Sequence, residues 1–379
     1  MSTHTHVITK NATRTGAATV PDPAPAPDLT IYAKVVDLKA LADRVYALEH
    51  PVVIPPSPPT TRPFPAPVTT QSIPIPASID ATGATDVSAG INGWLAGVPD
   101  GSIITATASA IYRLPQGIMS AARKNLIFRS AGASLHLTGA GGDQLASAFI
   151  LGHAYNGFWG PGGSDIAIEG FRIIGNAPKP GTFVEGTEAQ AGFEIEAATR
   201  VEISGCTIEG VWGDALKTGD AAASIWFHDN ICPTIGRNGT TIISGTDILS
   251  EKNTFGKIGY CAFDIEPNLA TEATLRAIFR ANVIASWGNA FFALDGSNAG
   301  APIDTVTVDG NSVTVGSLLS LAGFVGSVPT KARPRSIAVT NNHGSAPDTS
   351  RFAHIDGLTY KGNSPGGVPT ITDCTLVVQ

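Results

Sequence analysis

Six asparagines in the second half of the chain each follow a short run in which apolar and polar residues alternate. Successive members of the set are 23, 29, 29, 31 and 21 residues apart; they are Asn230, Asn253, Asn282, Asn311, Asn342 and Asn363. A strand and polar turn that recur every 20 to 30 residues or so are typical of a solenoid, whose coils bury their apolar sides against one another. The alternation has a period of two and uses Ile, Val, Phe and Thr, so it predicts strands.

Asparagine suits such a turn because it tolerates the left-handed backbone region and its amide can bond turn backbone. Equivalent asparagines could therefore stack from coil to coil as a ladder. Asparagine is also a common turn residue, which would explain any single case but not the recurrence. The absence of convincing helical stretches between the strands argues against a βαβ fold. We predict an all-β, right-handed parallel β-helix, with a β-sandwich or jelly roll as the alternative.

Composition narrows the possible partners. Only 15% of the 379 residues are charged, 42 are glycine, and the net charge is −7. A chain of this charge has no broad basic surface, so we expect no nucleic acid partner. No apolar run reaches 18 residues and no charged segment precedes an apolar one at the amino end, so we predict neither a membrane span nor a signal peptide.

Metal ligands are not indicated either. The four cysteines have no CxxC spacing: Cys206, Cys232, Cys261 and Cys374. His4 and His6 lie in a polar stretch without a Cys or carboxylate cluster. We therefore expect no metal site and no cofactor.

The amino-terminal quarter divides into three segments. Residues 1–30 are polar and rich in Ala and Pro, which predicts a disordered or attachment tail. Residues 31–50 predict a coiled-coil helix, because apolar residues occupy a and d positions of a heptad: Ile31, Leu38, Leu41, Val45 and Leu48. A lone amphipathic helix could instead pack on a domain. However, the proline-rich residues 51–77 predict a stiff spacer, so we expect the helix to associate with copies of itself as a trimer.

Residues 78–379 are expected to form the β-helix with a capping helix at its amino end. The helix is predicted to begin after Asp86 and to stop at Gly97. Its apolar face comprises Val87, Ile91, Trp94 and Leu95. A solenoid exposes an apolar end that such a helix can cover.

Two stretches near this helix carry a resemblance. Residues 80–86 (DATGATD) and 99–104 (PDGSII) look like the first coil of the pectate-lyase-like, right-handed parallel β-helix superfamily. Within that superfamily, the order of coiled coil, proline spacer and β-helix resembles bacteriophage tail spikes and minor tail proteins. The resemblance implies a homotrimeric virion component made in the host cytoplasm. Its amino end would join other phage tail proteins, and its β-helix would contact a glycan of the host envelope.

An acidic strip is the best candidate for chemistry. Asp264 and Glu266 lie in the sequence FDIEPN and share a face because they are two residues apart on a strand. Asp220 and Asp295 occupy comparable places on neighbouring coils, so carboxylates could approach the spacing of a glycosidase pair. The DIEPN stretch also resembles one in β-helix proteins that act on or bind polysaccharide. Solvated acids without a special role, or acids that bind sugar or calcium, are the alternatives.

Aromatic residues could form the sugar-binding surface. Trp212 and Trp287 hold matching positions on separate coils, where they could stack on sugar rings or simply pack. Tyr155 and Trp159 lie in a longer Gly-rich loop that could contact a glycan or another protomer. The chain lacks the GHG and DD motifs of polygalacturonases, so the active-site residues of that family cannot be transferred.

Two functions remain open at this stage. The first is an adhesive tail fibre or spike that binds envelope glycan, and the second is a depolymerase that cleaves it as a glycoside hydrolase or lyase. The β-helix fold hosts both, so the decision depends on the site.

Overall fold

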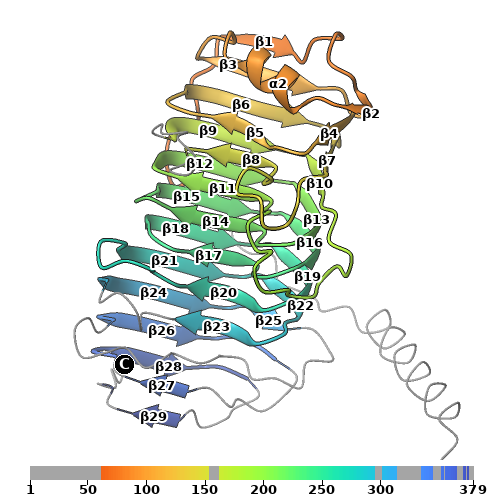
Figure 1. Ribbon diagram of the computed structural model, residues 1–379. Coiled ribbons are helices and arrows are strands. Elements are labelled where there is room, and N and C mark those ends of the chain that lie inside the picture. The colour runs from red at the N-terminus through yellow and green to blue at the C-terminus, as the bar shows by residue number, and fades with distance from the viewer. Residues whose placement is uncertain are drawn as a thin grey trace, which may run out of the picture. The chain divides into compact units, whose positions relative to one another are not determined.

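The protein is described by a computed structural model that covers residues 61–152, 162–294, 301–313, 334–344, 351–353, 355–364, 370–372 and 374. Its strands form three long sheets, called A, B and C, in which all the described pairs are parallel (Figure 1). Through the central coils, each turn contributes one strand to each sheet, so strands three apart in sequence become neighbours. The right-handed parallel β-helix that the repeats predict is confirmed.

The strands of each sheet follow the order of the coils. Sheet A consists of β1 (Gln71–Pro74), β3 (Ser102–Ala106), β6 (Lys124–Ser130), β9 (Gly163–Glu169), β12 (Ala198–Ser204), β15 (Ala223–His228), β18 (Thr246–Glu251), β21 (Thr274–Arg280), β24 (Ile303–Asp309), β26 (Ser336–Thr340) and β28 (Leu358–Lys361). Sheet B consists of β2 (Thr82–Asp86), β4 (Ile111–Leu114), β7 (Ser134–Leu137), β10 (Arg172–Ile174), β13 (Thr207–Val211), β16 (Ile231–Ile235), β19 (Thr254–Ile258), β22 (Val283–Ser286) and β25 (Ser312–Val313). Sheet C consists of β5 (Ile118–Ser120), β8 (Phe149–Leu151), β11 (Phe193–Glu196), β14 (Leu216–Gly219), β17 (Thr240–Ile242), β20 (Cys261–Ile265) and β23 (Ala290–Leu294). A separate pair joins β27 (Arg351–Ala353) to β29 (Thr370–Thr372).

The core is a column of inward side chains stacked coil on coil. In sheet A, Val201 pairs in register with Ile166 on one side and Ile225 on the other, and all three are fully buried. Phenylalanine rings stack in the same way in sheet C, where the register partners Phe149 and Phe193 have ring centroids 5.7 Å apart. Each buried ring contributes about 1.5–3 kcal/mol to folding. The repeated alternation of apolar residues thus becomes one continuous core.

The predicted asparagine ladder is present at the corner between sheets A and B. The side-chain oxygen of Asn282 accepts from the backbone N–H of Asn253 at 2.9 Å, and its Nδ2 donates to the Ser250 carbonyl at 3.0 Å. The same pattern links each asparagine of the ladder to the next, from Asn230 to Asn363. The amides therefore satisfy backbone groups that the turn would otherwise bury without partners.

The left-handed residue of this corner is not the asparagine itself. Asp229, Lys252 and Ala281, each directly before a ladder asparagine, have φ values of 53°, 55° and 52°. Gly310 and Gly362 occupy the same place farther along the stack. The preceding residue therefore makes the sharp turn, and the asparagine that follows faces inward to bind the backbone.

Helix α2 (Ser88–Leu95) lies at the amino end of the stack, as predicted (Figure 1). Its buried Ile91 and Leu95 belong to the core that the first coils begin. The N-cap residue is Val87 rather than Asp86, whose carboxylate instead accepts from the Ser88 N–H at 2.9 Å.

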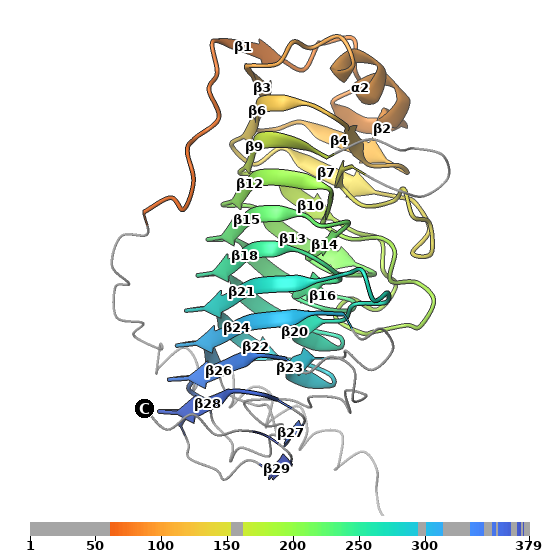
Figure 2. The same ribbon diagram turned by 90° about the vertical axis from the view of Figure 1, so that its left-hand side faces the viewer.

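Residues 61–74 lie against the β-helix rather than standing clear of it (Figure 2). Strand β1 pairs with β3, Arg62 forms an ion pair with Glu202, and the Val68 N–H donates to the Asn125 side chain at 3.1 Å. The β-helix therefore begins at β1, inside the proline-rich range 51–77. The expectations for residues 1–30, 31–50 and 51–60 lie outside the described residues.

Candidate functional site

The outer face of sheet C carries the strongest concentration of polar side chains near a cavity. Strand register brings one outward position from each of five strands into a row: Glu194, Lys217, Thr241, Asp264 and Ala293. Neighbouring strands of a sheet lie about 4.8 Å apart, so adjacent members of this row can interact. Glu194 and Asp264 are acids and Lys217 is a cation. They lie in one row even though each is separated from the next by at least one whole coil in the sequence.

Two long connections form a wall beside this face. Residues 175–192 join β10 to β11, and residues 138–148 join β7 to β8. The backbone N–H groups of Ala189 and Gln190 donate to the Gly141 carbonyl at 2.9 and 3.1 Å, which ties the two connections together. The longer one reaches several coils onward, where the rings of Phe183 and Tyr260 lie 5.1 Å apart.

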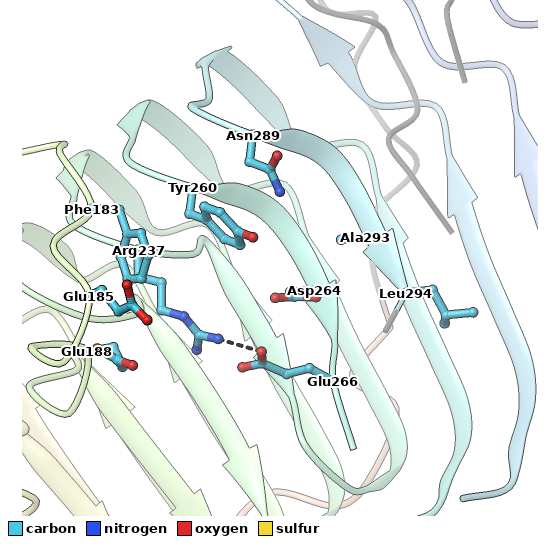
Figure 3. A pocket seen from close by; sticks show the side chains of 10 residues that line it. All are labelled: Phe183, Glu185, Glu188, Arg237, Tyr260, Asp264, Glu266, Asn289, Ala293 and Leu294. Carbon is cyan, nitrogen blue, oxygen red and sulfur yellow. Dashed lines mark hydrogen bonds and ion pairs between the residues drawn. The ribbon is translucent and has the colours of Figure 1, made fainter. Parts of the chain in front are cut away.

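The wall and sheet C enclose a cavity of about 420 Å³ (Figure 3). Its lining residues are Phe183, Glu185, Glu188, Arg237, Tyr260, Asp264, Glu266, Asn289, Ala293 and Leu294. A second cavity of about 390 Å³ adjoins it and shares Glu188, Arg237 and Glu266 with it. The two cavities therefore form one groove, and the Arg237–Glu266 ion pair lies at their boundary.

Asp264 sits at the bottom of the first cavity. Its side chain is almost fully buried, with 3% of the residue exposed, and it accepts a hydrogen bond from Asn238 Nδ2 at 3.0 Å. Burial raises the pKa of Asp264 well above its usual value, and the nearby Glu266 carboxylate raises it further. This carboxyl group is consequently suited to hold a proton at a pH where ordinary aspartates are ionised.

Glu266 lies just beyond the end of β20 and is more open to solvent, with 22% of its side chain exposed. Burial raises its pKa, although the ion pair with Arg237 opposes this shift. Arg237 also binds the buried Asp214 at 3.3 Å. Burial alone would lower the pKa of the guanidinium, but the Asp214 and Glu266 carboxylates raise it, so Arg237 remains charged.

Lys217 forms a second charged cluster in the adjoining cavity. Its ammonium group lies 2.8 Å from the buried Glu194 and 3.8 Å from Glu196. Burial would lower the pKa of Lys217, but Glu194 outweighs that effect and raises it. Both cations of the groove are therefore held by at least two carboxylates each.

The remaining acids of the predicted strip are not brought to this groove by the described residues. Asp220 lies in the turn after β14 with a φ of 47°, and it lines neither cavity. Asp295 lies outside the described residues. The strip is thus represented in the groove by Asp264 and Glu266.

The predicted aromatic platforms have other places in the structure. Trp287 is buried, with 6% exposed, and its ring packs 5.5 Å from that of Phe291. Trp212 lies under Gly141 and donates from Nε1 to Asn176 at 2.8 Å, so it supports the wall of the groove. Tyr155 and Trp159 lie outside the described residues. The aromatic side chains that do line the first cavity, Phe183 and Tyr260, were not singled out from the sequence as sugar-binding residues.

Glu185 and Glu188 were missed as well. They come from the connection before β11, which has no repeating pattern to relate it to the coils it reaches. The Gly-rich character of the connection and its length were the available signals.

The described residues bear on two further questions, a metal site and a membrane span. Among them, no group of three or more His, Cys, Asp or Glu side chains is arranged to hold a metal ion. No helix in these ranges is long and apolar enough to cross a lipid bilayer. Cys206, Cys232 and Cys261 are buried thiols, and burial raises the pKa of Cys206 to about 12.

Comparison with solved structures identifies the fold. The family 28 exopolygalacturonase of Yersinia enterocolitica superposes with a TM-score of 0.52 and 11% sequence identity, over 82% of this chain and 78% of that enzyme. The tailspike protein of Acinetobacter baumannii phage AM24 superposes with a TM-score of 0.51 and 13% identity, over 76% of this chain and 53% of the tailspike. No protein-family model and no curated protein sequence matches the chain. The chain thus shares its β-helix fold with an exopolygalacturonase and with a phage tailspike.

Proposed function

We propose that the protein cleaves a polysaccharide by glycoside hydrolysis in the groove on sheet C. The observation that carries this proposal is the pair Asp264 and Glu266. They lie two residues apart in the same cavity, and their environments differ: one carboxyl is buried and has a raised pKa, and the other is partly exposed beside a guanidinium. Pairs of carboxyl groups whose pKa values are set apart by their surroundings serve as acid and base in glycosidases.

The two side chains have distinct roles in this proposal. Asp264 gives its proton to the glycosidic oxygen as the bond from that oxygen to the anomeric carbon breaks. Glu266 accepts a proton from the water that adds to the anomeric carbon, and the ion pair with Arg237 favours its ionised form by opposing the rise in pKa that burial causes. After product release, Glu266 gives its proton to solvent and Asp264 takes one up, so both carboxyl groups return to their starting states. Residues 175–192 contribute Phe183, Glu185 and Glu188 to one side of this cavity.

A virion setting supports the same chemistry. The predicted order of tail, coiled coil, spacer and β-helix resembles phage tail spikes, and a phage tailspike shares this fold. We infer a homotrimeric phage tail protein whose β-helix faces the host envelope glycan. The trimer is tested by light scattering of the full chain and of a variant lacking residues 1–50, which should remain folded but associate less strongly, because the β-helix has its own core.

Glycan binding without cleavage is the second candidate. It is favoured by the near-complete burial of Asp264 and by its hydrogen bond to Asn238, both of which fit an acid that stabilises the coil. In that case the groove would hold a glycan as a receptor and leave its bonds intact.

The deciding experiment measures new reducing ends when the purified full chain is incubated with a panel of bacterial envelope polysaccharides. Asp264→Asn and Glu266→Gln should each reduce the rate at least about 100-fold, because general acid–base groups contribute factors of that size. Asp247→Asn is the matched control, since it removes an exposed carboxylate on sheet A and should leave the rate unchanged. Wild-type protein that binds a polysaccharide of the panel but produces no reducing ends would favour the receptor function.

A further inference from the structure

We propose that the groove on sheet C selects glycans that contain amino sugars and rejects glycans made of uronic acids. This inference rests on the proposed function for the place of binding, but it concerns the chemistry of the ligand. It also separates this chain from the exopolygalacturonase whose fold it shares.

The charges that line the first cavity are mostly negative. Its lining includes the carboxyl groups of Glu185, Glu188, Asp264 and Glu266, against the single guanidinium of Arg237 (Figure 3). With Asp264 protonated, three carboxylates still face one cation. A uronate would bring a further carboxylate into this partly enclosed space, where like charges repel strongly because little water screens them.

The cations of the groove are already engaged. Arg237 binds both Asp214 and Glu266, and Lys217 lies within 4 Å of Glu194 and Glu196. To bind a uronate, either cation would have to move away from a buried carboxylate, which would then lose its counter-ion, and such a loss is strongly destabilising. The structure therefore provides no ready counter-ion for an anionic sugar within the described part of the groove.

Glu188 supplies the attraction for an amino group. One of its oxygens, Oε2, is shielded from solvent and has no hydrogen-bond partner among the described residues. Glu188 lines both cavities, so its charge acts at the middle of the groove. An ammonium group of glucosamine would neutralise this charge, and the N–H of an acetamido group could satisfy it in part.

The neighbouring groups are compatible with a sugar ring. Tyr260 and Phe183 contribute aromatic surface to the lining of the cavity, and Asn289 offers an amide for hydroxyl groups. Burial raises the pKa of the Tyr260 hydroxyl, so it stays protonated and adds no negative charge. An amino sugar therefore finds apolar, hydrogen-bonding and anionic partners in one cavity.

Calorimetry with three tetrasaccharides tests the proposal. The probes are the β-1,4-linked tetramers of glucosamine and N-acetylglucosamine and the α-1,4-linked tetramer of galacturonic acid, titrated into the full chain carrying Asp264→Asn so that hydrolysis does not consume them. We expect glucosamine to bind tightest, N-acetylglucosamine more weakly and galacturonate least. Glu188→Gln should weaken binding of the glucosamine tetramer at least about tenfold, as expected for loss of a charged hydrogen bond. The matched control is Glu209→Gln, which removes a carboxylate on sheet B, outside the groove. It should not weaken binding of the glucosamine tetramer.

Two outcomes would overturn the proposal. One is binding of the galacturonate tetramer as tight as that of the glucosamine tetramer, either directly or only after calcium is added. The other is a glucosamine tetramer that fails to bind at millimolar concentration. Cleavage is measured separately with the wild-type chain. If the glycans bind in the predicted order but no new reducing ends form, the hydrolytic function is wrong and the ligand preference stands. If the chain cleaves the galacturonate tetramer, the hydrolytic function stands and the ligand preference is wrong.

Discussion

The asparagine corner and the outer face of sheet C are built on the same coil repeat, yet they use it in opposite ways. At the corner, coil after coil places the same residue in the same position, and each amide binds the next. On sheet C, the aligned positions carry Glu194, Lys217, Thr241, Asp264 and Ala293, which differ in charge and size. A position that repeats its chemistry serves the fold, and a position that varies its chemistry within a fixed register is free to form a site.

The largest effect on stability is expected at Arg237, because this residue both lines the groove and neutralises a buried carboxylate of the fold. Replacing Arg237 with methionine leaves Asp214, with 1% of its side chain exposed, as a buried charge without its cation. We expect a loss of about 3–5 kcal/mol in the free energy of unfolding, measured by urea denaturation.

The matched control is Arg276→Met, which breaks an ion pair with Asp247 whose side chains are 53% and 47% exposed. Such a pair contributes about 0–1 kcal/mol, so little change is expected. Equal losses of unfolding free energy from the two substitutions would show that Arg237, Asp214 and Glu266 do not form a buried charge network.

A smaller loss is expected from the corner. Asn282→Ala removes the partner of the Ser250 carbonyl and of the Asn253 N–H, both within the buried turn. The expected loss is about 2 kcal/mol, the lower end of the sum for two buried groups that each cost about 1–3 kcal/mol when left unpaired. Asn363→Ala, at the partly buried end of the ladder, should cost less. If the middle and end positions are equally tolerant, the ladder does not stabilise the corner as a stack.

The sequence predicts the asparagine corner far better than it predicts the outer face of sheet C. Six asparagines in matching runs were enough to predict the β-helix, the ladder and the burial of the alternating residues. The prediction failed only in detail, because the residue before each asparagine, such as Ala281, takes the left-handed conformation. Repetition makes such positions visible, since a core that stacks must repeat its spacing.

The groove could be anticipated only in part. Asp264 and Glu266 were found because their two-residue spacing fixes a common face. Glu185 and Glu188 could not be placed, since the path of a long connection depends on contacts with later coils and not on its own pattern. Likewise, two tryptophans at matching positions took different roles: Trp287 fills the core and Trp212 supports the wall. Spacing alone does not distinguish an outward from an inward ring at a corner.

The smallest expected effect is the pH dependence that comes from Asp264. The pKa of Asp264 in the folded protein is raised above the usual 3.8. The protonated Asp264 therefore contributes its full stabilisation below about pH 3.8, and this stabilisation is lost as the pH rises through the raised pKa. Asparagine resembles the protonated acid and cannot ionise, so Asp264→Asn should show a flatter stability profile. Thermal unfolding from pH 4 to pH 9 measures the difference. Parallel profiles for the two proteins would mean that Asp264 is ionised in the folded state.

The division between corner and face is tested most directly by measuring unfolding free energy and polysaccharide cleavage on the same two variants, Asn282→Ala and Asp264→Asn, at pH 7. We predict that Asn282→Ala loses stability while its folded fraction cleaves at nearly the wild-type rate. Asp264→Asn should lose at least about 100-fold in rate and retain wild-type stability or exceed it. An Asp264→Asn protein that is destabilised but still cleaves normally would contradict the account, because the carboxyl group on sheet C would then serve the fold and not the chemistry.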